Sequence, residues 1–190
     1  KHILVISFTA LMLGSLTGCV GSMLGRHSDE TQLVIPDFPT AKEQFAFAKM
    51  YQGSLITSPE LAKRRVQMDK LAQYYNRVLV NFPTDATYAP LTYLELGDCA
   101  AQSDYLDNAI QSYRHAMSLT QEEFVQVRAQ YSIAHLYDAQ GRHVEAKQIY
   151  KHLVDNHKNT ESGRVRDVLK RAYQRYMTVQ EKPAAGKTSR

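Results

Sequence analysis

The chain has 190 residues, 44% of them hydrophobic and 22% charged, which suits one globular domain with its own core and excludes a disordered or collagen-like chain. Nine glycines and six prolines are too few for an all-β fold with a turn about every 8–12 residues, so helices are favoured. Two cysteines exclude a disulfide-dense scaffold and a four-cysteine zinc site, and the formal net charge of +4 permits an anionic partner without requiring one.

The first 18 residues have the features of a secretory leader. An apolar run at 3–13 follows Lys1 and His2 and leads into small residues. This run is too short to span a bilayer, which needs about 20 residues. A basic start, an apolar stretch of about 7–15 residues and small residues before a cleavage site are typical of a secretory leader. We therefore expect residues 1–18 to be a signal peptide.

The leader ends in Leu16-Thr17-Gly18-Cys19, which resembles the lipobox of bacterial lipoproteins, cleaved just before the cysteine. The resemblance implies a diacylglyceryl thioether on Cys19 and an acyl group such as palmitate on its amine, and several buried chains anchor a protein stably. A buried structural cysteine is the alternative. An Asp after the cysteine resembles an inner-membrane retention signal in this family, but Val20 and Gly21 follow here. The resemblance therefore implies anchoring to the outer membrane, on its periplasmic face.

Residues 19–39 show no sustained helical period and contain Gly, Ser, Asp and Pro. This composition predicts a tether between the lipidated end and the folded domain. The alternative is an arm that packs on the domain through the apolar residues Leu33, Val34, Ile35 and Phe38. In either interpretation, the folded domain is expected to begin at about residue 40.

About seven helices joined by short loops are predicted from residue 40 onward, an all-α antiparallel array. A capping box at Thr40–Glu43 starts the first helix. Ser58 as cap and Pro59 as first helical residue start the second, which ends near Asn81. A second box at Thr120–Glu123 starts the fifth. The remaining helices are expected at 87–102, 105–118, 143–156 and 163–179.

Two segments repeat the same pattern of small and aromatic residues. Residues 90–121 carry Tyr93, Leu96, Gly97, Ala109, Tyr113 and Ala116, and residues 127–158 carry Ile133, Ala134, Tyr137, Gly141, Ala146 and Tyr150. This pattern resembles the tetratricopeptide repeat. The resemblance implies helix-turn-helix units stacked into a solenoid, in which Gly97 and Ala134 let the two helices of each unit approach closely.

A degenerate third unit precedes these repeats at 41–83. Ala48 and Leu71 are 23 residues apart where the pattern has 12, so its status as a repeat stays open. The junction that begins at Asn81-Phe82-Pro83 resembles those in periplasmic repeat proteins, including the lipoprotein of the outer-membrane β-barrel assembly machine. Three units are the minimum expected for a stable solenoid.

The repeat resemblance also implies a groove for a peptide segment along the first helices of the units. By the family's offsets, it is lined by Leu91, Leu94, Asp98 and Ala101 in one unit and by Arg128, Tyr131, His135 and Asp138 in the next. The degenerate unit adds Lys42, Phe45, Lys49 and Gln52. For Leu91 and Leu94 the alternative is a place in the core.

The helix at 163–179 is expected to cap the last repeat and has two distinct sides. Its apolar stripe consists of Val165, Val168, Leu169, Ala172, Tyr173 and Tyr176, and its basic face consists of Arg164, Lys170, Arg171 and Arg175. The basic face is either a solvated surface or a site for anionic lipid, cell-wall polymer or an acidic partner. Residues 181–190 lack periodicity and predict a flexible tail, which leaves 40–180 as the helical domain.

Motifs for chemistry are missing from the sequence, which has no Gly-rich phosphate loop, no His-Glu-x-x-His and no Gly-x-Ser-x-Gly. His143, His152 and His157 lack the spacing of a metal-binding pair on a helix and are expected at the surface. His135 and Asp138 are three residues apart and could hydrogen-bond as an acid and base. Because no nucleophile accompanies them, a ligand contact is the favoured role.

These patterns together predict a lipid-anchored periplasmic scaffold that binds another protein in an envelope complex, in outer-membrane protein assembly or in secretin or pilus biogenesis. The prediction includes no catalytic residue, no cofactor, no metal and no nucleic acid. Two alternatives stay open. One is an envelope enzyme whose site includes His135 and Asp138, and the other is a peptidoglycan-binding module that uses the basic last helix.

Overall fold

The computed structural model describes residues 33–181, which form seven helices and no strand. The helices are α1 (Ala41–Ser54), α2 (Leu61–Asn81), α3 (Tyr88–Gln102), α4 (Leu106–Leu119), α5 (Glu123–Ala139), α6 (His143–His157) and α7 (Gly163–Glu181). The predicted helices are therefore confirmed. No helix in this part of the chain is both long and apolar enough to cross a membrane. The predicted leader, Cys19 and nearly all of the predicted tail lie outside the described residues.

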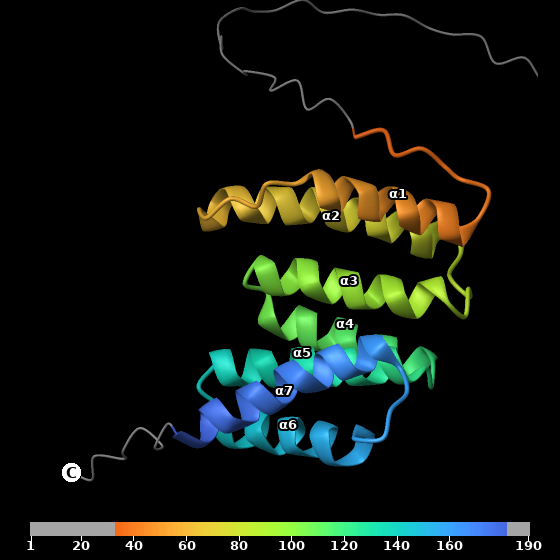
Figure 1. The fold of residues 1–190 in the computed structure, drawn as a ribbon. Coiled ribbons are helices and arrows are strands. Elements are labelled where there is room, and N and C mark those ends of the chain that lie inside the picture. Colours follow the sequence, from red (N-terminus) through yellow and green to blue (C-terminus); the bar gives the residue numbers. More distant parts are fainter. Residues whose placement is uncertain (1–32, 182–190) are drawn as a thin grey trace, which may run out of the picture. The chain divides into compact units, whose positions relative to one another are not determined.

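The helices pack in pairs, and each pair stacks on the next (Figure 1). Each helix packs on its neighbour in sequence, and α1, α3, α5 and α7 also contact one another in that order. The result is the predicted all-α solenoid, with α7 packed on both α5 and α6 at its end. We call the side formed by α1, α3, α5 and α7 the first-helix face.

Two of the three predicted helix starts are displaced. Thr40 caps α1 as predicted, because its side-chain oxygen accepts from the Glu43 N–H at 3.2 Å. The prediction that Ser58 caps α2 is wrong, since the helix begins at Leu61. The Gln67 side chain bonds the Ser58 N–H at 2.9 Å and the Ile56 carbonyl at 3.0 Å, and these bonds hold residues 56–58 in an extended loop before the helix.

At α5 the cap is Glu122 rather than Thr120. The Glu122 carboxylate accepts from the Val125 N–H at 2.9 Å, which satisfies one of the free amides of the first turn. The Thr120 hydroxyl accepts from the Glu122 N–H at 3.2 Å and so stabilises the turn before the helix. The longer acidic side chain takes over the capping role that the sequence pattern gave to the threonine.

The segment before α1 is bonded to the domain, as the alternative of a packed arm expects, but its predicted contact Val34 is wrong, because this side chain is 84% exposed. The Gln44 amide accepts from the Phe38 N–H at 3.0 Å and donates to the Pro36 carbonyl at 3.1 Å. The Asp37 carboxylate accepts from Arg77 Nη2 at 2.6 Å. Residues 36–38 are therefore tied to α1 and α2.

A buried tyrosine from the second helix of each pair points toward the first-helix face. Tyr75, Tyr113 and Tyr150 are all fully buried or nearly so. The Tyr75 hydroxyl donates to Gln52 at 2.9 Å and the Tyr113 hydroxyl to Asp98 at 2.6 Å. These bonds connect the apolar core to the polar groups of α1 and α3.

Gly97 lies where α3 and α4 approach each other, as the repeat pattern predicts. A Cβ at Gly97 would lie 2.5 Å from Cε1 of the Tyr113 ring, far inside van der Waals contact. The Tyr113 ring cannot easily retreat, because it is buried and its hydroxyl is bonded to Asp98. Glycine is therefore required at this position by packing.

We expect Gly97→Ala to destabilise the protein even though alanine favours helices. Overpacking costs about 1–3 kcal/mol and the gain in helix propensity is at most about 1 kcal/mol, so a net loss of about 1–2 kcal/mol is expected in chemical denaturation. Gly53→Ala is the matched control, because nothing lies within 4 Å of the added Cβ, and it should be neutral or stabilising. Equal effects of the two substitutions would contradict the packing role of Gly97.

Candidate partner-binding groove

Several predicted groove residues meet at a cavity on the first-helix face. The cavity has a volume of about 220 Å³ and lies between the α3–α4 pair and α5. We call it the α3–α5 pocket. It is lined by Asp98, Ala101, Gln102, Tyr113, Tyr131, Ser132, His135 and Leu136. Four of the eight residues predicted for the two clearer repeats thus line one pocket: Asp98, Ala101, Tyr131 and His135.

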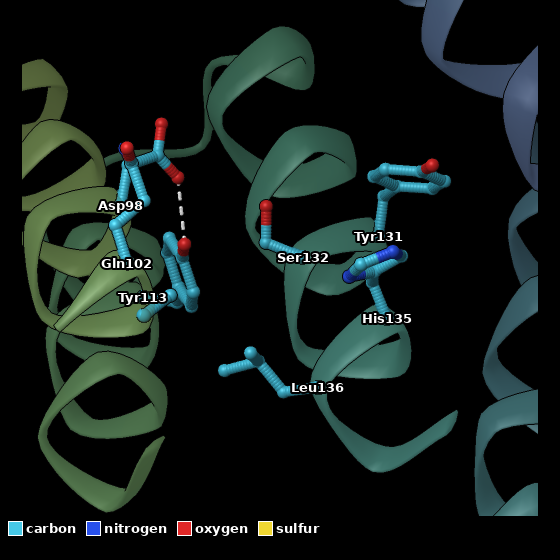
Figure 2. Close-up of a pocket in the computed structure, with 8 residues that line it drawn as sticks. Asp98, Gln102, Tyr113, Tyr131, Ser132, His135 and Leu136 are labelled. Carbon is cyan, nitrogen blue, oxygen red and sulfur yellow. Dashed lines mark hydrogen bonds between the residues drawn. The ribbon is translucent and has the colours of Figure 1, made fainter. Parts of the chain in front are cut away.

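Side chains from both helix pairs define the pocket (Figure 2). Ser132 and Leu136 stand on the side of α5 that faces α3 and α4, and the rings of Tyr131 and His135 stack with centroids 6.3 Å apart. The lining therefore combines hydrogen-bonding groups with aromatic and aliphatic surface. Its volume is below the range of about 300–1,000 Å³ for small-molecule sites, so it suits one or two side chains of a partner protein.

Leu94 and Leu91 are not in this pocket. The prediction that Leu94 contacts a partner is wrong, because its side chain is fully buried in the main hydrophobic core. The physical reason is that α1, α2, α4 and α5 all pack on α3, which leaves only a narrow strip of it exposed. Leu91 is half-buried and lines a separate cavity at the beginnings of α3 and α5.

A buried charge cluster lies beside the pocket and joins three helices. Glu95 of α3 is 3% exposed. Its carboxylate accepts from Arg128 Nη1 of α5 at 2.8 Å, from Gln52 Nε2 of α1 at 3.1 Å and from Lys49 Nζ of α1 at 3.3 Å. These partners belong to α1 and α5, so the cluster links α1, α3 and α5.

Arg128 bridges two carboxylates of α3. One terminal nitrogen of its guanidinium bonds Glu95 and the other bonds Asp98, while Asp98 also accepts from the Tyr113 hydroxyl. Asp98 and Arg128, both predicted as partner contacts, are therefore paired with each other. The prediction placed them correctly on one face but overlooked that opposite charges at these positions satisfy one another.

Burial and the neighbouring charges act in opposite directions on the two acids. Burial raises the pKa of Glu95, but the positive charges of Arg128 and Lys49 outweigh it and hold the pKa below its ordinary value. Burial also raises the pKa of Asp98, and there Arg128 only partly offsets it, so the pKa stays above its ordinary value. Of the two acids, Glu95 is therefore the one whose negative charge the cluster stabilises.

Glu95 was missing from the predicted site, although Lys49 and Gln52 were included. The family offsets point to positions 91, 94, 98 and 101 on this helix, and Glu95 falls between them. One signal could have revealed it, since Glu95 is the only acidic residue in the run Leu94-Glu95-Leu96-Gly97, which is otherwise apolar. An acid in a core-facing run needs a buried partner.

We expect Arg128→Met to destabilise the protein in a pH-dependent way. In the wild type, the pKa of Glu95 is lowered by folding, so its ionisation increases the free energy of unfolding at pH values above its ordinary pKa. This contribution is lost as the pH falls through the lowered pKa of the folded state. Without Arg128, burial of the charged carboxylate costs stability at neutral pH, and protonation of Glu95 relieves this cost. We expect the free energy of unfolding, measured in urea, to fall by about 3 kcal/mol at pH 7 and by less near pH 4.

The control for this experiment is Arg77→Met, which removes the exposed Arg77–Asp37 ion pair. Exposed ion pairs contribute little, because water screens them, so the loss should be smaller than for Arg128→Met. A loss for Arg128→Met that is equal at pH 7 and pH 4 would contradict the assigned role of Glu95.

His135 and Asp138 do not form the acid and base pair that their spacing allowed. Asp138 accepts instead from His143 Nδ1 at 2.7 Å, and His135 Nε2 accepts from Arg175 Nη2 at 3.1 Å. Burial lowers the pKa of His135, and the positive charge of Arg175 lowers it further. His135 is therefore a neutral hydrogen-bond acceptor toward α7, and no bond connects it to Asp138.

Three of the four residues of the predicted basic face turn back toward α5. The Arg164 guanidinium lies 4.2 Å from the centre of the Phe124 ring and that of Arg171 lies 5.4 Å from the Tyr131 ring. The third contact is the bond between Arg175 and His135. In each pair the two residues are 40 positions apart, because α5 and α7 run side by side in a constant register. All four side chains are nevertheless exposed, and Lys170 is the one without such a contact in the described part of the chain.

The apolar stripe of α7 largely follows the prediction. Val165, Val168 and Ala172 are buried, whereas Tyr173 is 52% exposed and its predicted core position is wrong. Val179 is buried instead. The stripe therefore extends along the helix, and Tyr173 falls on the solvent side of it.

Comparison with known proteins identifies the repeats. Residues 91–123 and 127–156 match the tetratricopeptide repeat family. These ranges correspond to α3–α4 and α5–α6, so the chain contains two tetratricopeptide repeats, and the α3–α5 pocket lies between them. The match does not include 41–83, whose status as a repeat stays a prediction. No curated protein matches the chain.

Proposed function

We propose that this protein is an interaction scaffold that binds a segment of a partner protein in the α3–α5 pocket. The observation that carries the proposal is the position of this pocket between two tetratricopeptide repeats, which generally mediate interactions between proteins. Asp98, Gln102, Ser132 and His135 offer the pocket both donors and acceptors of hydrogen bonds. The activity is recruitment of the partner rather than catalysis.

We further propose that the scaffold works at the bacterial outer membrane, on its periplasmic side. The support is the sequence of the leader, which ends in the lipobox-like Leu16-Thr17-Gly18-Cys19. A lipid on Cys19 would confine the repeats to one membrane surface and so raise the effective concentration for a partner on that surface. The partner would be a component of an envelope complex, in outer-membrane protein assembly or in secretin or pilus biogenesis.

We expect Gln102→Trp to abolish capture of the partner. The experiment purifies the tagged protein from detergent-solubilised envelope of the producing bacterium and compares the associated proteins by mass spectrometry. Gln102 is exposed and lines the α3–α5 pocket, so the indole would fill the pocket without disturbing the core. The matched control is Gln148→Trp, an exposed glutamine at the cavity between α4 and α6.

A partner that is lost with Gln102→Trp and retained with Gln148→Trp supports the proposal. The reverse pattern would place binding on the second helices and contradict it. Equal retention by both variants would also contradict it, because the pocket would then be dispensable.

We expect Cys19→Ser to release the protein from the membrane. Serine cannot form the thioether, and no lipid chain would then hold the protein at the bilayer. The measurement is the distribution of the protein between soluble and membrane fractions after cell breakage, followed by separation of inner and outer membranes. Unchanged recovery with the outer membrane would contradict lipid anchoring through Cys19, while leaving the pocket proposal intact.

A further inference from the structure

The α3–α5 pocket shares one lining residue with a second cavity. His135 lines this pocket and also a second cavity of about 420 Å³, whose other lining residues are Asp138, Ala139, Gly141, His143 and Arg175. His135 therefore lies between the two cavities. A segment long enough to occupy both would pass over His135 and approach Arg175.

Arg171 and Arg175 are one turn apart on α7 and border this path. Arg171 stacks on Tyr131, which lines the α3–α5 pocket, and its Nε donates to the Asp167 carbonyl at 3.4 Å. Among the residues that the structure describes, the ion pairs of α7 involve only Arg164 and Arg175. Arg171 thus keeps its terminal nitrogens available to an incoming acceptor.

Arg175 is only weakly neutralised. Its Nη1 lies 3.9 Å from Asp138 Oδ2, and that carboxylate is already engaged by His143 at 2.7 Å. Its Nη2 bonds the neutral His135. Asp138 is the one carboxylate that lines the second cavity, and it formally balances Arg175. Arg171, which has no ion pair in the described part of the chain, therefore supplies a net positive charge beside this cavity.

We propose that Arg171 and Arg175 bind an aspartate or glutamate side chain of the segment that occupies the α3–α5 pocket. The inference rests on the proposed function and adds the chemistry of the partner. A guanidinium presents its N–H donors in a rigid planar fork, which favours bidentate bonds to a planar carboxylate. Arg171 lies over the Tyr131 ring and Arg175 bonds His135, so contacts with α5 hold both α7 guanidinium groups near the groove.

An acidic protein segment fits this arrangement better than an anionic membrane. Arg175 lines the second cavity, and Arg171 lies over Tyr131, which lines the α3–α5 pocket, so a ligand that contacts both arginines lies along α5. The basic residues of this helix are all exposed, and Lys170 differs from the two arginines in making no contact with α5 among the interactions of the described residues. A flat bilayer surface would meet Lys170 at least as readily as the two arginines.

The test uses the complete purified chain and a display library of random peptides of about 12 residues. We expect the selected peptides to share an acidic residue at one position. Replacing this acid by its amide should weaken binding about tenfold, or by about 1.4 kcal/mol. The double variant Arg171→Gln/Arg175→Gln should weaken binding of the original peptide to the same extent. Lys170→Gln is the matched control and should leave the affinity unchanged.

The outcomes separate this inference from the proposed function. Peptides that are displaced by Gln102→Trp but show no acidic preference would overturn the inference and leave the pocket in place. Acidic peptides whose affinity does not change in the double variant would overturn it as well. A selection that yields no binder would overturn both.

A second measurement addresses the membrane as the ligand. Vesicles of phosphatidylethanolamine with and without phosphatidylglycerol are compared for binding of the wild type and the double variant. The inference predicts that the two proteins respond equally to phosphatidylglycerol. A response that is lost only in the double variant would overturn the inference in favour of an anionic lipid surface.

Discussion

The Glu95 carboxylate is buried in the middle of the solenoid, and burial of a charge is costly unless opposite charges and hydrogen bonds compensate it. Its compensation comes from Lys49 and Gln52 on one side and from Arg128 on the other. These partners belong to α1 and α5, so the ionised cluster forms only when three helix pairs are stacked. The cluster therefore makes the arrangement of the first-helix face depend on the whole array.

The same cluster determines which groups are available to a ligand. Arg128 is occupied by two carboxylates, and Asp98 by Arg128 and Tyr113, so neither is a free charge at the α3–α5 pocket. The available cationic groups lie instead at the α7 end, where Arg171 and Arg175 border the groove. The charge along the groove thus changes from a neutralised cluster to an excess of positive charge at α7, which would give the proposed partner segment a direction.

The sequence sufficed for the helices and the repeats, because helical period and the small residue at Gly97 are local signals, but it placed only one of three caps, at Thr40. It did not suffice for Leu94 or Glu95, whose surroundings come from distant helices: Lys49 and Arg128 are 46 and 33 positions away from Glu95. The arginines of α7 are intermediate. The spacing of Arg164, Arg171 and Arg175 equals that of Phe124, Tyr131 and His135. The sequence therefore contains the matching pattern, but the pairs can be assigned only once the register of α7 on α5 is known.

The central claim is that a partner segment lies in the α3–α5 pocket, and site-specific photocrosslinking in living cells tests it most directly. A photoreactive amino acid would replace Ala101 in the pocket or, as the comparison, Met117 at the cavity between α4 and α6. The account predicts a discrete crosslinked adduct from position 101 and none from position 117. An adduct from position 117 alone, or from neither position, would contradict it.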